Sequence, residues 1–392
     1  MNARFHEQLA ESIQQMTSAG TLKSFRFLQT PMNAWTTMEG RGEILVMSSN
    51  NYLGLAADPR VVEAGRQALA RYGAGTASVR FICGTFEIHR ELEEAIAGFL
   101  GTERALTYVS CWAANTGLIP TIAGPEDVII ADELNHASLI DGCRLASKTP
   151  RAIYRHSDMG HLEDLLREHS GARRRLILTD GVFSMEGDLA RLDEMVELAR
   201  KYDAVTIVDD SHGTGVTGHT GKGTAEHCGV QAEVDIYTST LGKALGGAAG
   251  GFVASSAAVI GMLEQASRPQ IFSNALPPTV SASSLAALGI LRDEPERVAA
   301  LRDKTAYARE LLGSHGYEVK DHPSAIIPIM IGDTAQAITT SARLLEKGVF
   351  ITGFGYPVVP EGTARLRVQA SYAHEKRDFD LFVEKLDEVM KG

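Results

Sequence analysis

The chain is poor in cysteine, has no long apolar run and carries no excess of positive charge. Its four cysteines, Cys83, Cys111, Cys143 and Cys228, are scattered over 392 residues, and no pair has Cys-x-x-Cys spacing. This spacing argues against a zinc site or a redox motif, so no metal is expected, and the low count favours reduced thiols in the cytoplasm. Because no stretch approaches 18 apolar residues, no membrane-spanning helix is expected.

Charge and composition narrow the class of protein further. The 38 basic residues stand against 49 acidic ones, which gives a net charge of −11, and 44% of the residues are hydrophobic. The acidic balance argues against a nucleic-acid partner or a membrane surface. The hydrophobic share is ordinary for a soluble globular protein, and the polar N-terminal sequence has no apolar signal core.

Seven apolar runs alternate with helical segments through the middle of the chain. They lie at residues 104–110, 127–132, 151–156, 175–181, 204–210, 235–240 and 250–255. Continuous apolar strands separated by helices indicate a mostly parallel sheet that helices cover on both faces. We therefore predict a large α/β domain with a seven-stranded sheet over residues 50–285.

The two ends of the chain have a different character. Residues 1–49 are predicted to form an N-terminal helix and an irregular arm. Beyond the large domain, helical patterns lie at 285–316, 335–348 and 376–391, and short strands at 325–331 and 364–371. This pattern predicts a smaller α+β domain over residues 286–392, which the N-terminal segment joins in space.

Polar or reactive side chains follow five of the predicted strands. Ligands of an open parallel sheet bind beyond the carboxyl ends of its strands, so these side chains are expected at one rim. They are Ser110, Cys111, Trp112, His136, Ser184, Asp209, His212, Thr240 and Lys243. Each has an ordinary alternative, such as a turn serine, a helix cap or a histidine satisfied in the core. Five strands that deliver such groups to one rim favour a ligand site.

Lys243 is the most informative of these residues. It lies in "TSTLGKALGG", between a run that predicts a buried strand and glycines that allow tight turns. A surface lysine is usually a solvated charge. At the end of a buried strand, however, lysine is poorly placed for solvation and well placed to be a nucleophile with a lowered pKa.

The groups at the rim match the parts of pyridoxal phosphate. The backbone N–H groups at residues 110–112, where a helix begins, and the hydroxyl of Thr240 suit a phosphate. His136 offers a flat ring, Asp209 a carboxylate for the pyridine nitrogen, and Lys243 an amine for the aldehyde. The sequence therefore predicts pyridoxal phosphate as the cofactor.

Motifs over nearly the whole chain resemble those of the α-oxoamine synthases, which are pyridoxal-phosphate enzymes of the aspartate-aminotransferase fold, also called fold type I. The motifs are "SNNYLGL" (49–55), "GTFEIHRELE" (84–93), "NHASLIDG" (135–142), "DGVFSMEGD" (180–188), "VDDSHGTG" (208–215), "TLGKALGG" (240–247), "SRPQIFSNALPP" (267–278) and "ARLRVQASYAH" (364–374). The resemblance implies a large cofactor-binding domain and a smaller C-terminal one.

Within that family, residues 77–85, 325–333 and 352–369 most resemble the glycine C-acetyltransferase subfamily. That resemblance implies condensation of glycine with acetyl-CoA. The sequence "SCWAAN" (110–115) lacks the acidic residue that this subfamily has after the aromatic one, and "GTFEIH" (84–89) is closer to relatives that take other acyl groups. A synthase of the 8-amino-7-oxononanoate or serine palmitoyltransferase type, with a longer acyl donor or another amino acid, therefore stays open.

The resemblance also implies roles for individual residues around the cofactor. Lys243 would form the Schiff base and His136 would stack on the ring. Asp209 would pair with the pyridinium, while His212 and Ser184 would hydrogen-bond the ring oxygen. Lys243 would also remove the Cα proton of the amino acid, so one residue would serve as both anchor and base.

The resemblance implies roles for four more residues, which lie outside the group at the rim. Asn51 and Arg367 would bind the amino-acid carboxylate, with arginine supplying a bidentate fork. Ser273 and Asn274 would reach the phosphate of the neighbouring subunit's cofactor. The resemblance thus implies a homodimer with shared active sites.

Two rival interpretations remain at the level of the sequence. An aminotransferase or a C–S lyase of the same fold would share Asp209 and Lys243, but not the combination of "GVFSM", "DDSHGTG" and "ASVRFICGT". A non-catalytic partner subunit, as occurs among some relatives, would lack the Schiff-base lysine, and this chain keeps it.

Overall fold

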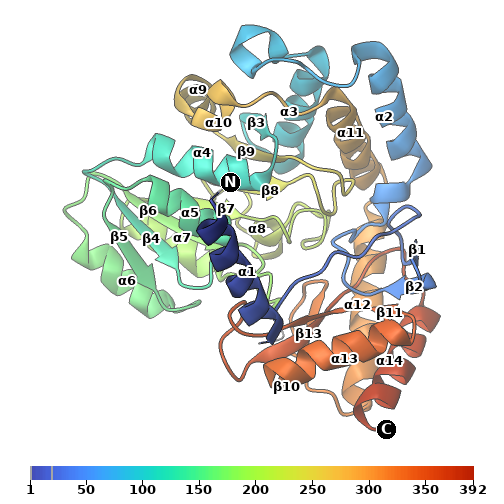
Figure 1. Ribbon diagram of the computed structural model, residues 1–392. Helices are drawn as coiled ribbons and strands as arrows, with labels where there is room; N and C mark the ends of the chain where they lie inside the picture. The colour runs from blue at the N-terminus through green and yellow to red at the C-terminus, as the bar shows by residue number, and fades with distance from the viewer. Residues whose placement is uncertain (1, 19–20) are drawn as a thin grey trace.

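The structure is a computed structural model that describes residues 2–18 and 21–392. Its centre is a seven-stranded sheet with helices on both faces (Figure 1). In chain order the strands are β3 (Arg104–Tyr108), β4 (Val128–Asp132), β5 (Arg151–Tyr154), β6 (Arg175–Asp180), β7 (Ala204–Asp209), β8 (Ile236–Thr240) and β9 (Gly251–Ser255). All seven predicted apolar runs are therefore strands of this one sheet.

The order across the sheet is β3-β9-β8-β7-β6-β4-β5, and β9 alone runs antiparallel to its neighbours. The carboxyl ends of the six parallel strands consequently meet at one edge. Register places Asp180, the last residue of β6, beside Asp209, the last residue of β7. The predicted α/β class with a mostly parallel sheet is confirmed.

Helices pack around this sheet and form an apolar core on each face. Alternate residues of β6 point to opposite cores, with Leu176 and Leu178 in one and Ile177 in the other. The helices and short helical turns of this part are η1 (Leu55–Ala57), α2 (Pro59–Tyr72), η2 (Arg80–Gly84), α3 (Glu87–Leu100), α4 (Cys111–Ile122), α5 (Ala137–Leu145), α6 (Met159–Glu168), α7 (Leu192–Lys201), α8 (Thr224–His227), α9 (Ala257–Ala266), α10 (Arg268–Phe272) and α11 (Pro278–Asp293). Strands buried on both faces explain why the runs lack polar alternation.

The C-terminal part is a second, smaller layer below the large sheet (Figure 1). Its sheet has the order β10-β13-β12. Its elements are α12 (Glu296–Ser314), β10 (Ile326–Gly332), α13 (Thr334–Glu346), β11 (Val349–Phe350), β12 (Thr352–Phe354), β13 (Ala364–Gln369) and α14 (Lys376–Met390). The three strands of its sheet pair antiparallel and are flanked by helices, which agrees with the predicted α+β pattern.

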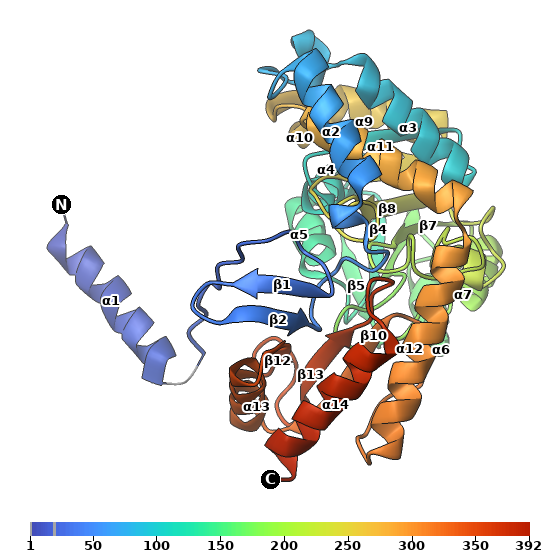
Figure 2. The same cartoon turned by 90° about the vertical axis from the view of Figure 1, so that its right-hand side faces the viewer.

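The N-terminal arm is built into this smaller part. It forms β1 (Trp35–Met38) and β2 (Gly42–Val46), an antiparallel pair, and β2 then pairs in parallel with β11. The helix α1 (Ala3–Ser18), by contrast, stands away from the rest of the chain (Figure 2), and none of its residues is buried. No helix in the described ranges has both the length and the apolar character needed to cross a bilayer.

The structure differs from the sequence-based outline at the junction of the two parts. The predicted boundary at 285/286 falls inside α11, which continues to Asp293 and packs against α2 and α3. The single helical pattern expected over 285–316 is interrupted before Glu296, where Pro295 lacks the N–H that a continuing helix needs. A boundary near residue 294 fits the packing better, and the exact domain limits remain a prediction.

Candidate active site

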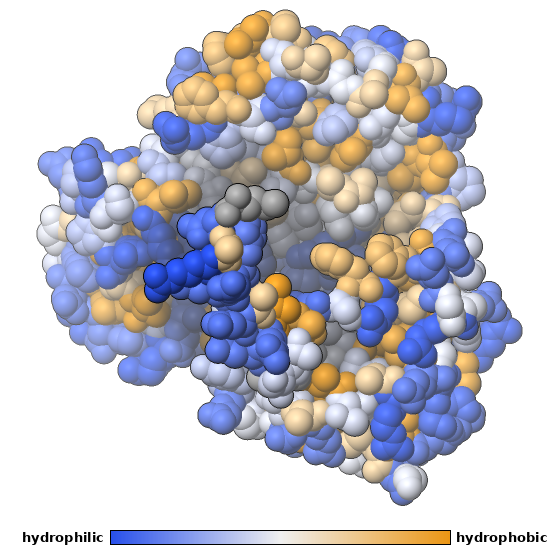
Figure 3. All heavy atoms as spheres, viewed as in Figure 1, coloured by the Kyte–Doolittle hydropathy of each residue, from blue (hydrophilic) through white to orange (hydrophobic). Residues whose placement is uncertain are grey.

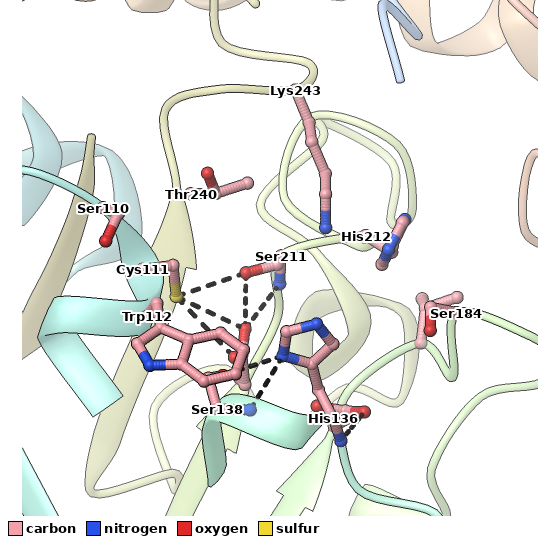
Figure 4. Close-up of a pocket in the computed structure, with 13 residues that line it drawn as sticks. Ser110, Cys111, Trp112, His136, Ser138, Ser184, Ser211, His212, Thr240 and Lys243 are labelled. Atoms are coloured by element: carbon pink, nitrogen blue, oxygen red, sulfur yellow. Dashed lines mark hydrogen bonds between the residues drawn. The ribbon is translucent and has the colours of Figure 1, made fainter. Parts of the chain in front are cut away.

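A cavity of about 240 Å³ lies at the carboxyl edge of the large sheet, and we call it the rim cavity. The side chains that line it come from the ends of several strands (Figure 4). They are Ser110, Cys111, Trp112, His136, Ser138, Asp180, Val182, Ser184, Asp209, Ser211, His212, Thr240 and Lys243. All nine rim residues that the sequence singled out are therefore brought together. The surrounding face is hollowed between the upper and lower parts of the molecule (Figure 3).

Lys243 lies in the turn after β8, and its side chain points into the rim cavity (Figure 4). The turn needs glycine at Gly246 and Gly247, whose φ angles of 98° and 67° are unfavourable for other residues. Burial lowers the pKa of the Lys243 amine, and Asp209 opposes that shift without cancelling it. The amine is thus easier to deprotonate than an exposed lysine, as expected of a nucleophile.

The carboxylate of Asp209 is held on both oxygens. Oδ2 accepts from Nδ2 of Asn115 at 2.6 Å, and Oδ1 accepts from the hydroxyl of Ser211 at 2.6 Å and from its backbone N–H at 3.1 Å. The Sγ of Cys111 lies 3.6 Å from Oδ2. These donors fix the direction of the carboxylate, so Asp209 presents its oxygens in one orientation at the floor of the cavity.

His136 caps α5 and is oriented by the same network. The second N–H of Asn115 donates to Oγ of Ser138 at 2.9 Å, and Ser138 lies 2.8 Å from Nδ1 of His136. The backbone N–H of Ser138 also donates to Nδ1, at 3.2 Å, which makes Nδ1 an acceptor and places the ring proton on Nε2. Burial against the surrounding protein lowers the pKa of His136, although much of its ring is open to the cavity. The backbone N–H of His136 donates to Asp180 at 2.8 Å.

His212 is fixed by a hydrogen-bond chain that begins in the C-terminal part. Nε2 of Gln369, on β13, donates to the phenol oxygen of Tyr52 at 2.8 Å, and Tyr52 lies 2.7 Å from Nδ1 of His212. Burial lowers the pKa of His212 well below its usual value, with Lys243 as a further cause, so the ring is neutral. Because Tyr52 donates to Nδ1, the remaining ring proton lies on Nε2.

The start of α4 forms a pocket for an anion. Ser110 caps the helix by accepting from the N–H of Ala113 at 3.0 Å, while within the described ranges the N–H groups of Cys111 and Trp112 have no acceptor. A Cβ on Gly251 would lie 2.3 Å from the nitrogen of Cys111, so only glycine lets β9 approach this turn. Free N–H groups at a helix start attract phosphate.

Arg367 and the loop of Ser184 meet beside the cavity. Nη1 of Arg367 donates to the carbonyl of Ser184 at 2.8 Å, and the guanidinium carbon lies 4.7 Å from the centre of the Phe354 ring. In the part of the chain that is described, this largely buried cation has no carboxylate within 4.0 Å, and its Nε has no partner. Burial lowers the pKa of Arg367.

The loop that carries Ser184 is fastened from behind by His156. Its Nδ1 lies 3.0 Å from Asp132 and its Nε2 lies 2.7 Å from Asp188, so both nitrogens donate and the ring is an imidazolium. Burial opposes this charge, but the hydrogen bonds to the two carboxylates outweigh it and raise the pKa of His156 to about 10. The edge of the ring also packs on Phe183.

Four predicted site residues, Asn51, Ser273, Asn274 and Arg367, lie outside the lining of the rim cavity. Asn51 is buried, and its amide donates to the carbonyl of Met32 at 3.2 Å and accepts from the N–H of Ala56 at 3.1 Å. Ser273 and Asn274 follow α10, and Asn274 is exposed and bridges to Val79. Their roles, like that of Arg367, therefore remain predictions for a complex with substrate or with a second subunit.

Sequence reasoning missed the residues that orient the others. They are Tyr52, Asn115, Ser138, Asp180, Ser211 and Gln369. Ser138, Asp180 and Ser211 lie within a few positions of the rim residues, and strand-end position alone could have pointed to them. Burial raises the pKa of Asp180 well above its usual value, with the charge of Asp209 as a further cause.

The residues present fit pyridoxal phosphate. The unpaired N–H groups at the start of α4 match its phosphate, the fixed carboxylate of Asp209 matches its pyridine nitrogen, and Lys243 matches its aldehyde. In residues 2–18 and 21–392, no group of three or more His, Cys, Asp and Glu side chains could hold a metal ion.

Known proteins resemble the chain over nearly its full length. The family model "Aminotransferase class I and II" matches residues 42–386. The mitochondrial 2-amino-3-ketobutyrate coenzyme A ligase of Bos taurus is 44% identical over 382 residues, which cover 97% of this chain and 91% of that relative. The 8-amino-7-oxononanoate synthase of Thermosipho melanesiensis is 43% identical over 382 residues, which cover 97% of each protein.

A solved structure agrees with these relatives. The high-resolution structure of SPT with a PLP internal aldimine has a TM-score of 0.93 and 29% identity, and the match covers 99% of this chain and 98% of that one. The relatives, the fold and the cavity lining thus point to the same cofactor chemistry. The chain belongs to the class I and II aminotransferase family, as a pyridoxal-phosphate enzyme of the α-oxoamine synthase group.

Proposed function

We propose that this protein condenses glycine with a short acyl-CoA, acetyl-CoA first, and releases a 2-amino-3-oxo acid and free CoA. The match to a 2-amino-3-ketobutyrate coenzyme A ligase, at 44% identity over 97% of the chain, carries the proposal. The rim cavity supports the same reaction class because it places an amine beside a fixed carboxylate and an anion-binding helix start.

Pyridoxal phosphate, when bound, withdraws electrons from the α-carbon of an attached amino acid and so makes its Cα–H bond acidic. We propose that the helix-start N–H groups at residues 111–112, with Thr240, hold its phosphate. Asp209 holds the pyridine nitrogen in its protonated form, and Lys243 holds the aldehyde carbon. His136 stacks on the ring, and the Nε2–H of His212 and the hydroxyl of Ser184 donate to the ring oxygen.

Lys243 also moves the proton in this proposal. With pyridoxal phosphate bound, the Lys243 amine would act as the base, because its lowered pKa keeps part of it neutral. The amine takes the Cα proton of glycine and holds it at Nζ. A carbon–carbon bond then forms between the glycine α-carbon and the acyl carbon, and the thioester C–S bond breaks. CoA leaves as a thiolate and takes up one proton.

Arg367 binds the glycine carboxylate in this proposal. Its guanidinium has no carboxylate partner in the described chain, and a substrate carboxylate would supply one. Binding at that point would fix the orientation of the amino acid in the site. Asn51 would join this contact through the second N–H of its amide, since the first donates to the Met32 carbonyl.

We further propose a cytoplasmic homodimer in which Ser273 and Asn274 reach the neighbour's cofactor phosphate. Exposed apolar side chains beside them support an interface, since Phe81, Ile82 and Phe272 are all at least 66% exposed. Apolar residues also gather at the top of the face shown in Figure 3. Exposed clusters of this kind mark protein contacts.

A substrate panel tests the proposed reaction. Purified holoenzyme is mixed with glycine, serine or alanine and with acyl-CoAs from acetyl to palmitoyl, and release of the CoA thiol is followed. Glycine with acetyl-CoA should give the highest kcat/KM. An advantage of more than tenfold for a long acyl-CoA or for alanine would assign the enzyme to another α-oxoamine synthase, and amino exchange with an α-keto acid would assign it to the aminotransferases.

A further inference from the structure

A second cavity lies away from the rim cavity and shares none of its lining residues. Its volume is about 640 Å³, and we call it the helix cavity because α3 and α11 form two of its walls. These helices run side by side in the upper part of Figure 2. Cavities of roughly 300–1,000 Å³ are the usual size for small-molecule sites.

The wall of the helix cavity is mainly apolar. Phe99 and Ala95 come from α3, and Leu285, Leu288 and Leu291 come from α11. Leu288 and Leu291 are buried at the base, with 4% and 0% of their surface exposed. An apolar wall of this depth favours a hydrocarbon chain over a polar metabolite.

Two helical glycines enlarge the helix cavity, although the backbone conformation at these positions does not require glycine. Gly98 lies in α3 and Gly289 lies in α11, and neither has a positive φ angle. A Cβ at either position would meet no atom within 4 Å, so close packing does not explain them either. Glycine weakens a helix relative to alanine, and the effect of both here is to leave space open.

One cation at the rim of the helix cavity is available to a ligand. Lys222 is half-buried, and in residues 2–18 and 21–392 its ammonium has no carboxylate within 4.0 Å. Glu226 fixes the loop instead by accepting from the backbone N–H groups of Thr220 and Lys222, at 3.1 and 3.0 Å. Arg292, the other cation, already pairs with Asp293 at 2.8 Å.

We propose that the helix cavity is a binding site for a small amphipathic carboxylate, an alkyl chain of about eight carbons with one carboxyl group. The chain lies among Phe99, Leu288 and Leu291, where each buried methylene strengthens binding about fourfold. The carboxylate pairs with the ammonium of Lys222. This site is separate from the residues of the proposed reaction.

The proposal is tested by calorimetric titration of octanoate into the holoenzyme. Glycine and CoA are present at saturating concentration, so that the amino-acid site and the acyl-donor site are filled. One octanoate should bind per chain, and hexanoate should bind about sixteenfold more weakly because it lacks two methylenes. Lys222→Gln should weaken octanoate about fivefold, as expected for a pair near the surface. The matched control Lys347→Gln, which removes a lysine on the far side of the chain, should leave the affinity unchanged.

Gly289→Leu should abolish octanoate binding, because leucine fills the cavity at a position where a Cβ meets no atom. A cooperative thermal transition would establish that this variant folds, and Gly98→Leu provides the same test from the opposite wall. The proposal is overturned if octanoate does not bind to the wild type, or if it binds equally well to Lys222→Gln. It is also overturned if both leucine variants still bind octanoate. Octanoate that binds only when CoA is left out would belong to the acyl-donor site, and that result would overturn the proposal too.

Discussion

The two halves of the candidate site differ in how complete they are within a single chain. On the cofactor side, Asp209 accepts three hydrogen bonds and His136 and His212 each have their proton placed by a neighbour. On the substrate side, the cation of Arg367 has no carboxylate within 4.0 Å in the described residues, and Asn274 is exposed. The comparison indicates that the cofactor half is organised before anything binds, and we propose that glycine and a second subunit complete the substrate half.

Replacement of Lys243 should cause the largest loss, because one amine serves the cofactor half as both anchor and base. Lys243→Ala should lower kcat for CoA release about 10⁴-fold or more. The surface variant Lys201→Ala provides the control and should keep full activity. If borohydride reduction and peptide mapping place the cofactor on another lysine, the cofactor half is assigned wrongly.

Asp209→Asn should be the next most severe change. The amide keeps the shape of the side chain but removes the negative charge, so we expect kcat to fall about 10³-fold. Asn115→Ala leaves the charge and removes only one of its donors, so a smaller loss of about tenfold is expected. Equal losses in the two variants would mean that position rather than charge matters at this end of the cofactor.

Arg367→Ala tests the substrate half. Removal of one partner of a desolvated charge pair costs about 2–4 kcal/mol, and we expect it mainly as a higher KM for glycine. Arg367→Lys should recover part of the affinity, because it keeps the charge but not the fork. A fall in kcat at unchanged KM would show instead that Arg367 acts on the cofactor side, through the loop of Ser184.

Hybrid dimers test whether the substrate half crosses between subunits. Lys243→Ala and the double variant Ser273→Ala/Asn274→Ala should each be impaired alone. Mixed after dissociation, they should regain about one quarter of wild-type activity, because half of the dimers are hybrids and each hybrid has one intact site. No recovery, or full activity in a monomer measured by sedimentation, would contradict shared sites.

The smallest effect is expected at His156, which holds the loop of Ser184 between the two halves of the site by hydrogen-bonding Asp188. Histidine titrates near pH 6.5 when unfolded and near pH 10 here, so its stabilising charge is complete below pH 6.5 and is lost as pH rises to 10. Between those values the wild type should lose about 1 kcal/mol more unfolding free energy than His156→Gln. Parallel denaturant curves for both proteins at each pH would measure this difference. If the unfolding free energy changes with pH equally in both proteins, His156 is neutral.

The sequence predicted the sheet and the rim because both follow from local patterns. Continuous apolar runs mark buried strands, and the residues after each run reach one edge by topology alone, which is why Lys243 and Asp209 were found. The orienting residues carry no such signal. Asn115 and Asp209 are 94 positions apart, and Tyr52 and Gln369 are 317 apart, so only tertiary packing brings each pair together.

The hydrogen-bond chain from Gln369 through Tyr52 to His212 has a consequence for how the enzyme is made. Protein synthesis runs from the N-terminus, so the large sheet can fold while the last strand is still absent. Gln369 lies at the end of β13, 23 positions from the end of the 392-residue chain. Until that strand docks, the Tyr52 hydroxyl lacks the hydrogen bond from Gln369, although its contact with His212 can still form. A newly made chain can therefore complete this hydrogen-bond chain only after β13 has left the ribosome.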